Sequence, residues 1–451
     1  ILLMTPTMQK RFFRLIYSAV CTAGIYVLLR SILFKNPSSQ REHLVTGPVS
    51  SRNAIHVTQW FNSGQISKGP IINCAALINA DKNELEKSKK YMDRYPESMQ
   101  SNLDFLEIHK NCGDFTKKNG YFMEPLTLEE KEFPIAFGIL MYKDVAQTEF
   151  LLRTIYRPQN VYCIHLDRDS APDVKQAMQS LVQCFDNVFI ASKLEQVVYA
   201  GFPRLQADVN CMADLLKSRI PWKYYINLAS QAFPLKTNAE IVKILKIYNG
   251  ANDIEGIIGK RIHKWRFEKT WVLIPNPKGG KPSLRADDAK KSSPPHNIEI
   301  VRGSAYGIFS KGFVNYIVNN EIAKDLLEWS KDTYSPDEHY WATLHHLKNN
   351  PHLETPGGYK GTADEKPWLA VYASWGTVDP CHGKWAHGVC IFGVEDLNYL
   401  VGKRHELFAN KFYRNYQYHA IECLAEHLYN RTVEKAPFDT SFYEKLPFIK
   451  P

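Results

Sequence analysis

The chain has 451 residues, of which 44% are hydrophobic and 12% aromatic, with a formal net charge of +9. This length and composition predict a large hydrophobic core and exclude an intrinsically disordered protein. The basic residues are spread out without a run of five like charges, so the sequence does not predict nucleic-acid binding and suits instead an anionic ligand such as a nucleotide diphosphate or an acidic glycan.

The N-terminal part contains an uncharged apolar segment, 15–29, bordered by Arg14 and Arg30. Both arginines can extend toward the membrane surface, which predicts a transmembrane signal anchor over 12–34. Basic residues precede this segment, so residues 1–11 are expected in the cytoplasm and the rest of the chain in the lumen, a type II topology. A cleaved signal peptide is the alternative, although no small-residue cleavage pattern follows the segment.

The chain after the anchor is expected to form a stem over 35–130, then a domain over 131–430 and a C-terminal tail over 431–451. In the domain, apolar runs of strand length alternate with segments of helical spacing. Predicted strands cover 134–142, 160–166, 187–191 and 223–228, and predicted helices cover 145–156, 171–185, 206–217 and 238–248. This alternation predicts an α/β fold with a Rossmann-type, mostly parallel sheet flanked by helices, and a ligand at the carboxyl ends of its strands.

Two segments in the second half have the composition of loops. Residues 275–296 are rich in Lys, Pro and Gly and are predicted to form a flexible basic loop, and 349–366 form a second Pro/Gly-rich loop. No Walker loop and no GxGxxG precedes any predicted helix, so the common phosphate-binding motifs are absent from the sequence.

Cysteine usage indicates an oxidising compartment. One of the nine cysteines, Cys21, lies in the predicted anchor, and the other eight form an even set that fits four disulfides. Eight cysteines allow 105 pairings, and the spacings alone do not choose among them. No Cys/His spacing indicates zinc. A single glycosylation sequon begins at Asn430, which is compatible with a lumenal surface.

The stretch SPDEHYWATL, residues 335–344, places two carboxylates behind a Ser-Pro pair. A local interpretation is a capping box, with Ser335 as N-cap, Pro336 in the first turn and Glu338 three residues after the cap. A catalytic interpretation is compatible with it, because a carboxylate in the first turn of a helix is favoured in its charged form by the helix dipole. Glycosidase chemistry is excluded, since the adjacent Asp337 and Glu338 cannot flank a glycosidic bond.

Long ordered blocks of the sequence resemble the core-2/I-branching β-1,6-N-acetylglucosaminyltransferases. The blocks are 157–167, 204–212, 233–242, 303–308, 329–344 and 407–412, and the likeness extends over roughly 70–430. The resemblance implies a GT-A-like fold and a type II, Golgi-membrane enzyme. Such an enzyme moves GlcNAc from UDP-GlcNAc, with inversion and without a metal, to a Gal or GalNAc hydroxyl on a glycoprotein or glycolipid glycan.

The resemblance also implies residue roles. The expected disulfides are Cys74–Cys423, Cys112–Cys184, Cys163–Cys211 and Cys381–Cys390. The catalytic base is expected at Glu338. Nucleotide-sugar contacts are expected at Leu140, Met141, Tyr142, Asp167, Arg168, Asp169, Tyr199, His387 and Lys411. Acceptor contacts are expected at Arg261, Lys264, Asp253 and Glu255, and an aromatic acceptor contact near Ser374, Tyr372 or Trp375. No metal ligand is expected, although Asp167-Arg168-Asp169 is a DxD sequence of the kind that binds manganese in other GT-A enzymes.

The sequence departs from the family pattern at several positions. His387 stands where an Arg is usual, and Ala229, Ser230 and Ala232 replace a Cys, a Gly and an Asp before Phe-Pro. A missing acid at a strand end is expected to need a compensating acid, for which Asp253 and Glu255 are the candidates. These departures keep open a family member with weak or lost activity that acts as a lumenal binding protein. A xylosyltransferase-like enzyme with another donor or acceptor also stays open.

Overall fold

The computed structural model describes residues 72–95, 101–376, 379–402 and 404–449. Among these residues, no helix is both long and apolar enough to cross a membrane. The predicted anchor, 12–34, lies outside the described residues.

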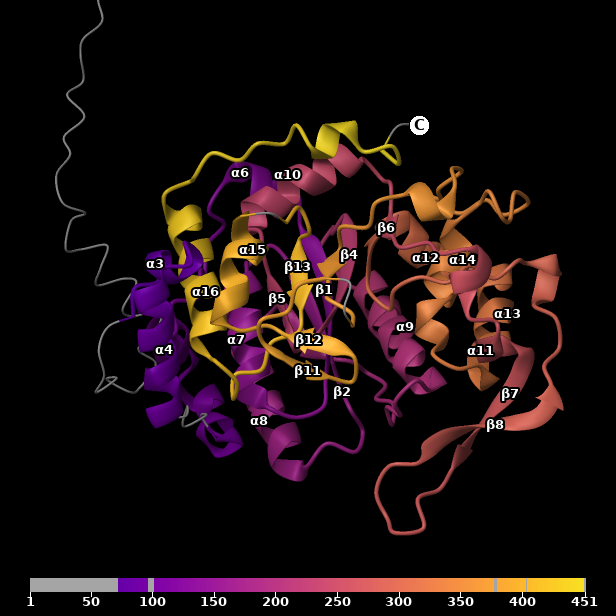
Figure 1. Ribbon diagram of the computed structural model, residues 1–451, viewed down its shortest axis with the longest axis horizontal. Coiled ribbons are helices and arrows are strands. Elements are labelled where there is room, and N and C mark those ends of the chain that lie inside the picture. The colour runs from indigo at the N-terminus through magenta and orange to yellow at the C-terminus, as the bar shows by residue number, and fades with distance from the viewer. Residues whose placement is uncertain (1–71, 96–100, 377–378, 403, 450–451) are drawn as a thin grey trace, which may run out of the picture. The chain divides into compact units, whose positions relative to one another are not determined.

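The central feature is a six-stranded sheet in the order β3-β2-β1-β4-β9-β6 (Figure 1). Its strands are β1 (Ile135–Met141), β2 (Val161–Leu166), β3 (Val188–Ile190), β4 (Tyr224–Ala229), β6 (Asp253–Ile254) and β9 (Gly307–Ser310). The first four run parallel, whereas β9 is antiparallel to both of its neighbours. The prediction of a mostly parallel sheet is confirmed, and all four predicted strands are present.

Helices cover both faces of this sheet, which explains the continuous apolar character of its strands. On one face they are α7 (Val145–Ile155), α8 (Pro172–Val182) and α10 (Asn238–Tyr248). On the other they are α9 (Phe202–Leu216), α12 (Lys311–Asn319), α13 (Glu321–Trp329) and α14 (Tyr340–His345). Helix α9 begins earlier than predicted because Gly201 and Pro203 suit the start of a helix.

One glycine in the sheet permits a close contact that the site needs. A Cβ on Gly138 of β1 would lie 2.0 Å from the hydroxyl of Tyr225 on β4, so a larger residue has no room. The Tyr225 hydroxyl donates a hydrogen bond of 3.1 Å to the buried carboxylate of Asp208 on α9. Gly138 therefore allows the sheet to hold α9 by a polar contact.

Segments outside the main α/β unit pack around it. The helices before β1 are α3 (Cys74–Ile78), α4 (Lys82–Arg94), α5 (Cys112–Lys118) and α6 (Leu128–Glu132), and those near the C-terminus are α15 (Leu397–Gly402) and α16 (His419–Val433). The part of the predicted stem that the structure describes is thus folded. Residues after α16 also contribute to the core, since Tyr443, Leu446 and Phe448 are buried.

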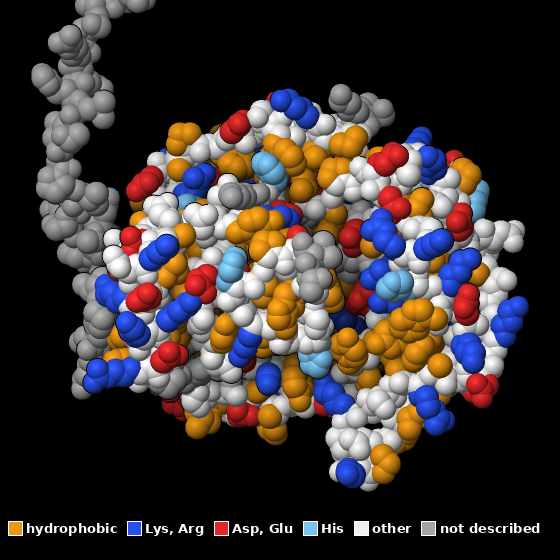
Figure 2. Space-filling model, in the orientation of Figure 1, with side chains coloured by type: hydrophobic (Ala, Val, Ile, Leu, Met, Phe, Trp, Pro, Cys, Tyr) orange, Lys and Arg blue, Asp and Glu red, His pale blue; other side chains and the backbone are white. Residues whose placement is uncertain are grey.

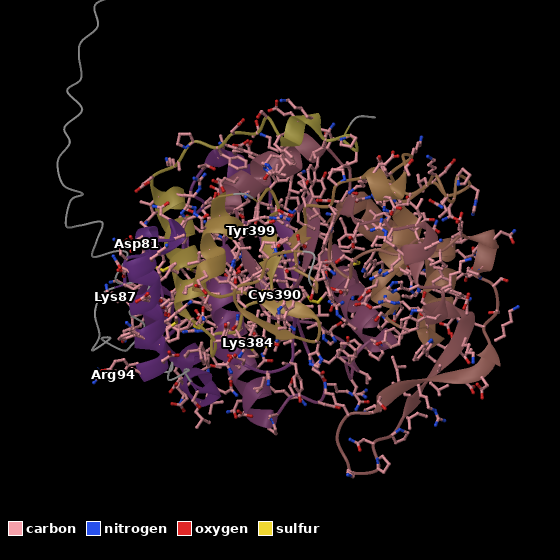
Figure 3. All side chains as sticks on the ribbon, viewed as in Figure 1. Asp81, Lys87, Arg94, Lys384, Cys390 and Tyr399 are labelled. Atoms are coloured by element: carbon pink, nitrogen blue, oxygen red, sulfur yellow. A yellow bond between two sulfur atoms is a disulfide. The ribbon has the colours of Figure 1, made fainter. Side chains whose placement is uncertain are left out.

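Four disulfides join these parts, with the pairing that the resemblance implies. They are Cys74–Cys423, Cys112–Cys184, Cys163–Cys211 and Cys381–Cys390. The first ties α3 to α16, and the last closes a loop that contains the first strand and the turn of the β11–β12 hairpin. Figure 3 shows Cys390 near the middle of the viewed face and Asp81, Lys87 and Arg94 along α4 at its edge.

Three smaller sheets complete the fold, and one of them corrects a prediction. The first has three strands, β10 (Val371–Tyr372), β13 (Phe408–Asn410) and β5 (Ala232–Pro234). The second is the hairpin of β11 (Lys384–Ala386) and β12 (Val389–Ile391). The third is the hairpin of β7 (Lys269–Ile274) and β8 (Ser283–Lys290). The flexible loop predicted over 275–296 is wrong for 283–290, which pair with β7. This hairpin is mostly exposed, so its sequence lacks the apolar alternation of a half-buried strand.

Candidate functional site

The base turn, Ser335–His339, leads into α14 and carries both candidate carboxylates. Ser335 has a φ of 46° and makes no side-chain cap, and residues 336–338 form a 3-10 turn that ends before α14 begins at Tyr340. The predicted capping box is therefore wrong. A tertiary contact explains the difference, because the Ser335 N–H donates to the Ala200 carbonyl at 2.7 Å and holds the backbone out of the helical path.

Two arginines, in place of a helix dipole, face the carboxylate of Glu338. Arg266 Nη1 donates to Glu338 Oε2 at 2.5 Å, and Arg302 Nη2 lies 3.6 Å from the same oxygen. Among the described residues, none donates a hydrogen bond to Oε1. The Glu338 carbonyl accepts a hydrogen bond of 2.7 Å from the Gly303 N–H. A larger residue at this glycine has no room, because its Cβ would collide with the Glu255 carbonyl. One oxygen is thus anchored and the other is available.

The neighbouring Asp337 has a buried carboxylate that holds the turn in place. Its buried carboxylate pairs with Arg204 on α9 at 2.9 Å, and Arg204 also lies 3.4 Å from Asp208. Burial raises the pKa of Asp337, and the Arg204 cation opposes that rise. Asp208 accepts further hydrogen bonds from Tyr225 and Asn227. This closed network pins the base turn to α9 and leaves Glu338 as the more accessible of the two carboxylates.

His339, the next residue, is buried among aromatic rings. Its ring lies 6.0 Å from that of Phe267 and 6.1 Å from that of Trp329, measured between centroids. Neither ring nitrogen has a hydrogen-bond partner in the described structure. Burial lowers the pKa of His339 to about 3, and the cations of Arg266 and Lys291 add to this effect. His339 is therefore a neutral packing residue beneath the site.

The predicted nucleotide contacts meet at the carboxyl ends of β1 and β2. Leu140 and Met141 end β1 and Tyr142 follows it, while the Asp167 N–H donates to the Met141 carbonyl at 3.0 Å. Arg168 and Asp169 come next in the chain, and Asp169 accepts a hydrogen bond of 2.6 Å from Gln196. The described residues contain no group of three or more His, Cys, Asp or Glu residues that could hold a metal ion.

Lys281, which the sequence did not single out, occupies this strand-end region. Its ammonium contacts the buried carboxylate of Asp167, donates to the Val197 carbonyl at 2.9 Å and lies 4.1 Å from the centroid of the Tyr142 ring. Lys281 belongs to the turn of the β7–β8 hairpin, far away in sequence. The basic composition of that segment was the only feature of the sequence that could have indicated a contact between Lys281 and the strand ends.

The remaining predicted donor contacts surround the β11–β12 hairpin. The exposed ring of Tyr199 lies 6.1 Å from that of His387, which sits in the hairpin turn with a φ of 52°. Lys411 follows β13, and its N–H donates to the Cys390 carbonyl at 3.4 Å. Burial lowers the pKa of the Lys411 ammonium. The structure thus joins Tyr199 with His387, and Lys411 with β12.

The acceptor predictions divide into exposed and buried residues. Arg261 and Lys264 are exposed, and Arg261 pairs with Asp364 at 3.1 Å. Glu255 interacts electrostatically with Arg302 and Glu338, and burial raises its pKa. Asp253, in contrast, is fully buried.

Asp253 is a wrong acceptor prediction because its carboxylate is already satisfied. Lys366 Nζ donates to it at 3.0 Å, as do the Leu369 N–H at 3.0 Å and the Tyr248 hydroxyl at 3.1 Å. The same contacts prevent it from compensating for the missing acid at Ala232.

The structure also places Ala232, the candidates for the aromatic acceptor contact, and Asn430. Ala232 is fully buried on β5 opposite Asn410 of β13, whose buried side-chain oxygen has no partner in the described structure. Of the three aromatic-contact candidates, Ser374 and Tyr372 are buried, whereas Trp375 is 56% exposed. Asn430 lies half-buried in α16 and not in a surface loop, so its glycosylation stays a prediction.

The viewed face of the molecule is hollowed near its middle (Figure 2). Figure 2 shows a hollow between the side that carries β11 and β12 and the side that carries α9 and α14, with acidic and basic side chains visible inside it.

Comparisons with known proteins show the family of the chain. A family model described as Core-2/I-Branching enzyme matches residues 135–401. A human protein named beta-1,3-galactosyl-O-glycosyl-glycoprotein beta-1,6-N-acetylglucosaminyltransferase 3 is 34% identical over 426 residues, 90% of this chain and 94% of its own length. A mouse protein named N-acetyllactosaminide beta-1,6-N-acetylglucosaminyl-transferase is 40% identical over 342 residues, 73% of this chain and 82% of its own.

Burial of His339 predicts a loss of stability in acid. The unfolded chain takes up a proton at this histidine near pH 6.5, whereas the folded protein does so only near pH 3. Between these values the unfolded state binds more protons, so stability falls as the pH falls. Between about pH 7 and about pH 5, we expect the free energy of unfolding to fall by about 2 kcal/mol less in His339→Phe than in the wild-type protein.

Chemical denaturation at both pH values measures this difference, with His352→Phe, at an exposed histidine, as the matched control. Equal losses of stability in wild type and His339→Phe would contradict the assignment.

Proposed function

Because the chain belongs to the Core-2/I-branching enzyme family and is a β-1,6-N-acetylglucosaminyltransferase, we propose that the site around Glu338 transfers GlcNAc from UDP-GlcNAc to a galactose or GalNAc hydroxyl. The fold is consistent with the GT-A class. The observation that carries the assignment to this site is the half-anchored carboxylate of Glu338, with Oε2 on two arginines and Oε1 available.

The proposed reaction is a single displacement with inversion. The acceptor hydroxyl oxygen attacks the anomeric carbon of GlcNAc, its proton passes to the Glu338 carboxylate, and the bond to UDP breaks. One C–O bond forms, one C–O bond breaks, and UDP leaves with the bonding electrons. Asp337 takes no proton in this scheme, because it is committed to Arg204.

Cationic side chains are proposed to stabilise the departing diphosphate. Lys411 and His387 both border the β12 region, and the carboxylate of Asp167 already pairs with Lys281. Preorganised positive groups stabilise charge that develops on a leaving group. A site whose positive charge comes from side chains such as Lys411 supports transfer that does not depend on a metal.

The location that we propose is the Golgi membrane, with the described residues on the lumenal side. Four disulfides support an oxidising compartment. The predicted anchor over 12–34 supports a single-pass type II topology. The acceptor would then be a glycan on a glycoprotein or glycolipid that passes through the same compartment.

An acceptor panel tests the function directly. The full chain is incubated with UDP-GlcNAc and core-1, core-3 or polylactosamine acceptors, and the linkage of the product is determined by NMR. A β-1,6-linked GlcNAc on one of them is expected. Tight UDP binding without transfer to any acceptor would favour the alternative of a lumenal binding protein, for which the buried Ala232 is the motivating departure.

Transfer is expected to survive excess EDTA, because Lys411 and its neighbours supply the positive charge at the leaving group. Initial rates with EDTA, with added manganese and with neither should agree within about twofold. Activity that EDTA abolishes and manganese restores would instead assign Asp167 and Asp169 to a metal site.

Removal of Lys281 is expected to strengthen UDP binding. Lys281 covers Tyr142 and Asp167, two positions proposed to contact the uridine, so the nucleotide must displace it. Lys281→Ala should lower the Kd for UDP by about three- to tenfold in calorimetry, a gain of roughly 1 kcal/mol. Lys278→Ala removes the same charge from an exposed site in the same turn and is the control. Weaker UDP binding by Lys281→Ala would show that Lys281 is a ligand of the nucleotide.

A further inference from the structure

An aromatic cluster lies beside the base turn and has no role in the chemistry described above. It consists of Trp265 at the start of α11 (Trp265–Glu268), Trp271 on β7 and Tyr334 directly before the base turn. The ring centroids of Trp265 and Tyr334 are 5.0 Å apart, those of Trp271 and Tyr334 4.7 Å, and those of Trp265 and Trp271 5.8 Å. Each ring therefore contacts the other two.

This cluster is partly exposed to solvent, whereas a cluster in the hydrophobic core would be buried. Trp265 is 48% exposed, and Tyr334 and Trp271 are partly exposed. Figure 2 shows hydrophobic side chains gathered beside the hollow, between the positions that Figure 1 labels α9 and α11. An exposed patch of large aromatic rings beside a polar site is typical of a binding surface.

Arg266 connects the cluster to the proposed base. Its guanidinium carbon lies 5.6 Å from the ring centroid of Trp265 and 5.7 Å from that of Tyr334, while its Nη1 donates to Glu338 at 2.5 Å. The Tyr334 N–H donates to the Arg266 carbonyl at 2.9 Å. The rings are thus held at a fixed place next to the carboxylate.

The surroundings of the rings limit the chemistry of the occupant. Trp265 stands between the exposed Lys264 and Arg266, and the ring of His263 lies 6.4 Å from it. An occupant must offer an apolar face to the rings and hydroxyl groups to the polar neighbours. A pyranose meets both requirements, because its axial C–H groups carry partial positive charge toward the negative face of an aromatic ring and its hydroxyls point sideways.

We propose that Trp265, Trp271 and Tyr334 form a platform on which the acceptor glycan stacks the sugar next to the one that receives GlcNAc. The proposal rests on the proposed function, since it takes Glu338 as the base toward which the accepting hydroxyl points. The platform binds the acceptor only. It makes affinity depend on the length of the glycan, because a monosaccharide at Glu338 does not extend to the rings.

The test compares a monosaccharide galactoside with an N-acetyllactosamine oligosaccharide as acceptors of the full-length protein. Trp265→Ala should raise the KM for the oligosaccharide about tenfold and leave the KM for the monosaccharide, kcat and the Kd for UDP within about twofold. Trp265→Phe keeps a flat ring and should stay close to wild type. Leu128→Ala, at a 68% exposed leucine on α6, is the surface control.

Two outcomes would overturn the platform. One is an oligosaccharide KM that Trp265→Ala leaves unchanged. The other is equal damage by Trp265→Ala and Trp265→Phe together with a lower melting temperature, which would make Trp265 a packing residue.

Binding without turnover separates this proposal from the proposed function. Titration of the oligosaccharide, followed by intrinsic tryptophan fluorescence, needs no transfer. Saturable quenching in wild type that Trp265→Ala weakens supports the platform even if no acceptor in the panel receives GlcNAc. No quenching in wild type contradicts the platform even if transfer is observed.

Discussion

The site depends on how one short turn holds two adjacent carboxylates in different environments. Asp337 points into the protein and pairs with Arg204, whereas Glu338 remains partly exposed and contacts Arg266 and Arg302. A buried carboxylate without its cation would cost several kcal/mol, so the Asp337 pair fixes the turn against α9. That constraint determines where the only accessible carboxylate of the turn is presented.

In the proposed mechanism, the same turn lies between the residues assigned to the donor and those assigned to the acceptor. Toward the strand ends lie Tyr142, Asp167 and the Tyr199–His387 pair, which suit a nucleotide. Toward α11 and β7 lie Arg266 and the exposed ring of Trp265, which suit a sugar. We propose that at Glu338 an acceptor hydroxyl from one side meets an anomeric carbon from the other. The β7–β8 hairpin reaches both sides, since it carries Trp271 and also Lys281.

The first half of the fold was predictable from the sequence because its strands are buried on both faces. Runs such as 134–142 are apolar throughout, and only a central parallel strand has that pattern in a chain of alternating helices. The β7–β8 hairpin was missed for the opposite reason. Its strands are mostly exposed, so Lys and Asp residues hide the period and the Pro and Gly residues of its turn dominate the composition.

Within the site, the sequence analysis proposed Glu338 and the strand ends but not the side chains that contact them. Residue pattern alone did not choose the disulfides or the base, which came from the resemblance. Arg266 and Lys281 reach their carboxylate partners across sequence separations of 72 and 114 residues, and no local pattern indicates such contacts. The capping box at Ser335 failed because a tertiary hydrogen bond to Ala200 overrides a local preference.

The central claim is that Glu338 acts as the base while Asp337 holds the turn. A parallel measurement of transfer rate and unfolding free energy in Glu338→Gln and Asp337→Asn tests it most directly. The account predicts that Glu338→Gln loses transfer by about a hundredfold or more with its stability and UDP affinity nearly unchanged. It predicts that Asp337→Asn loses about 1–3 kcal/mol of stability and retains more transfer than Glu338→Gln. Wild-type turnover by Glu338→Gln, or complete loss of transfer in a fully stable Asp337→Asn, would contradict it.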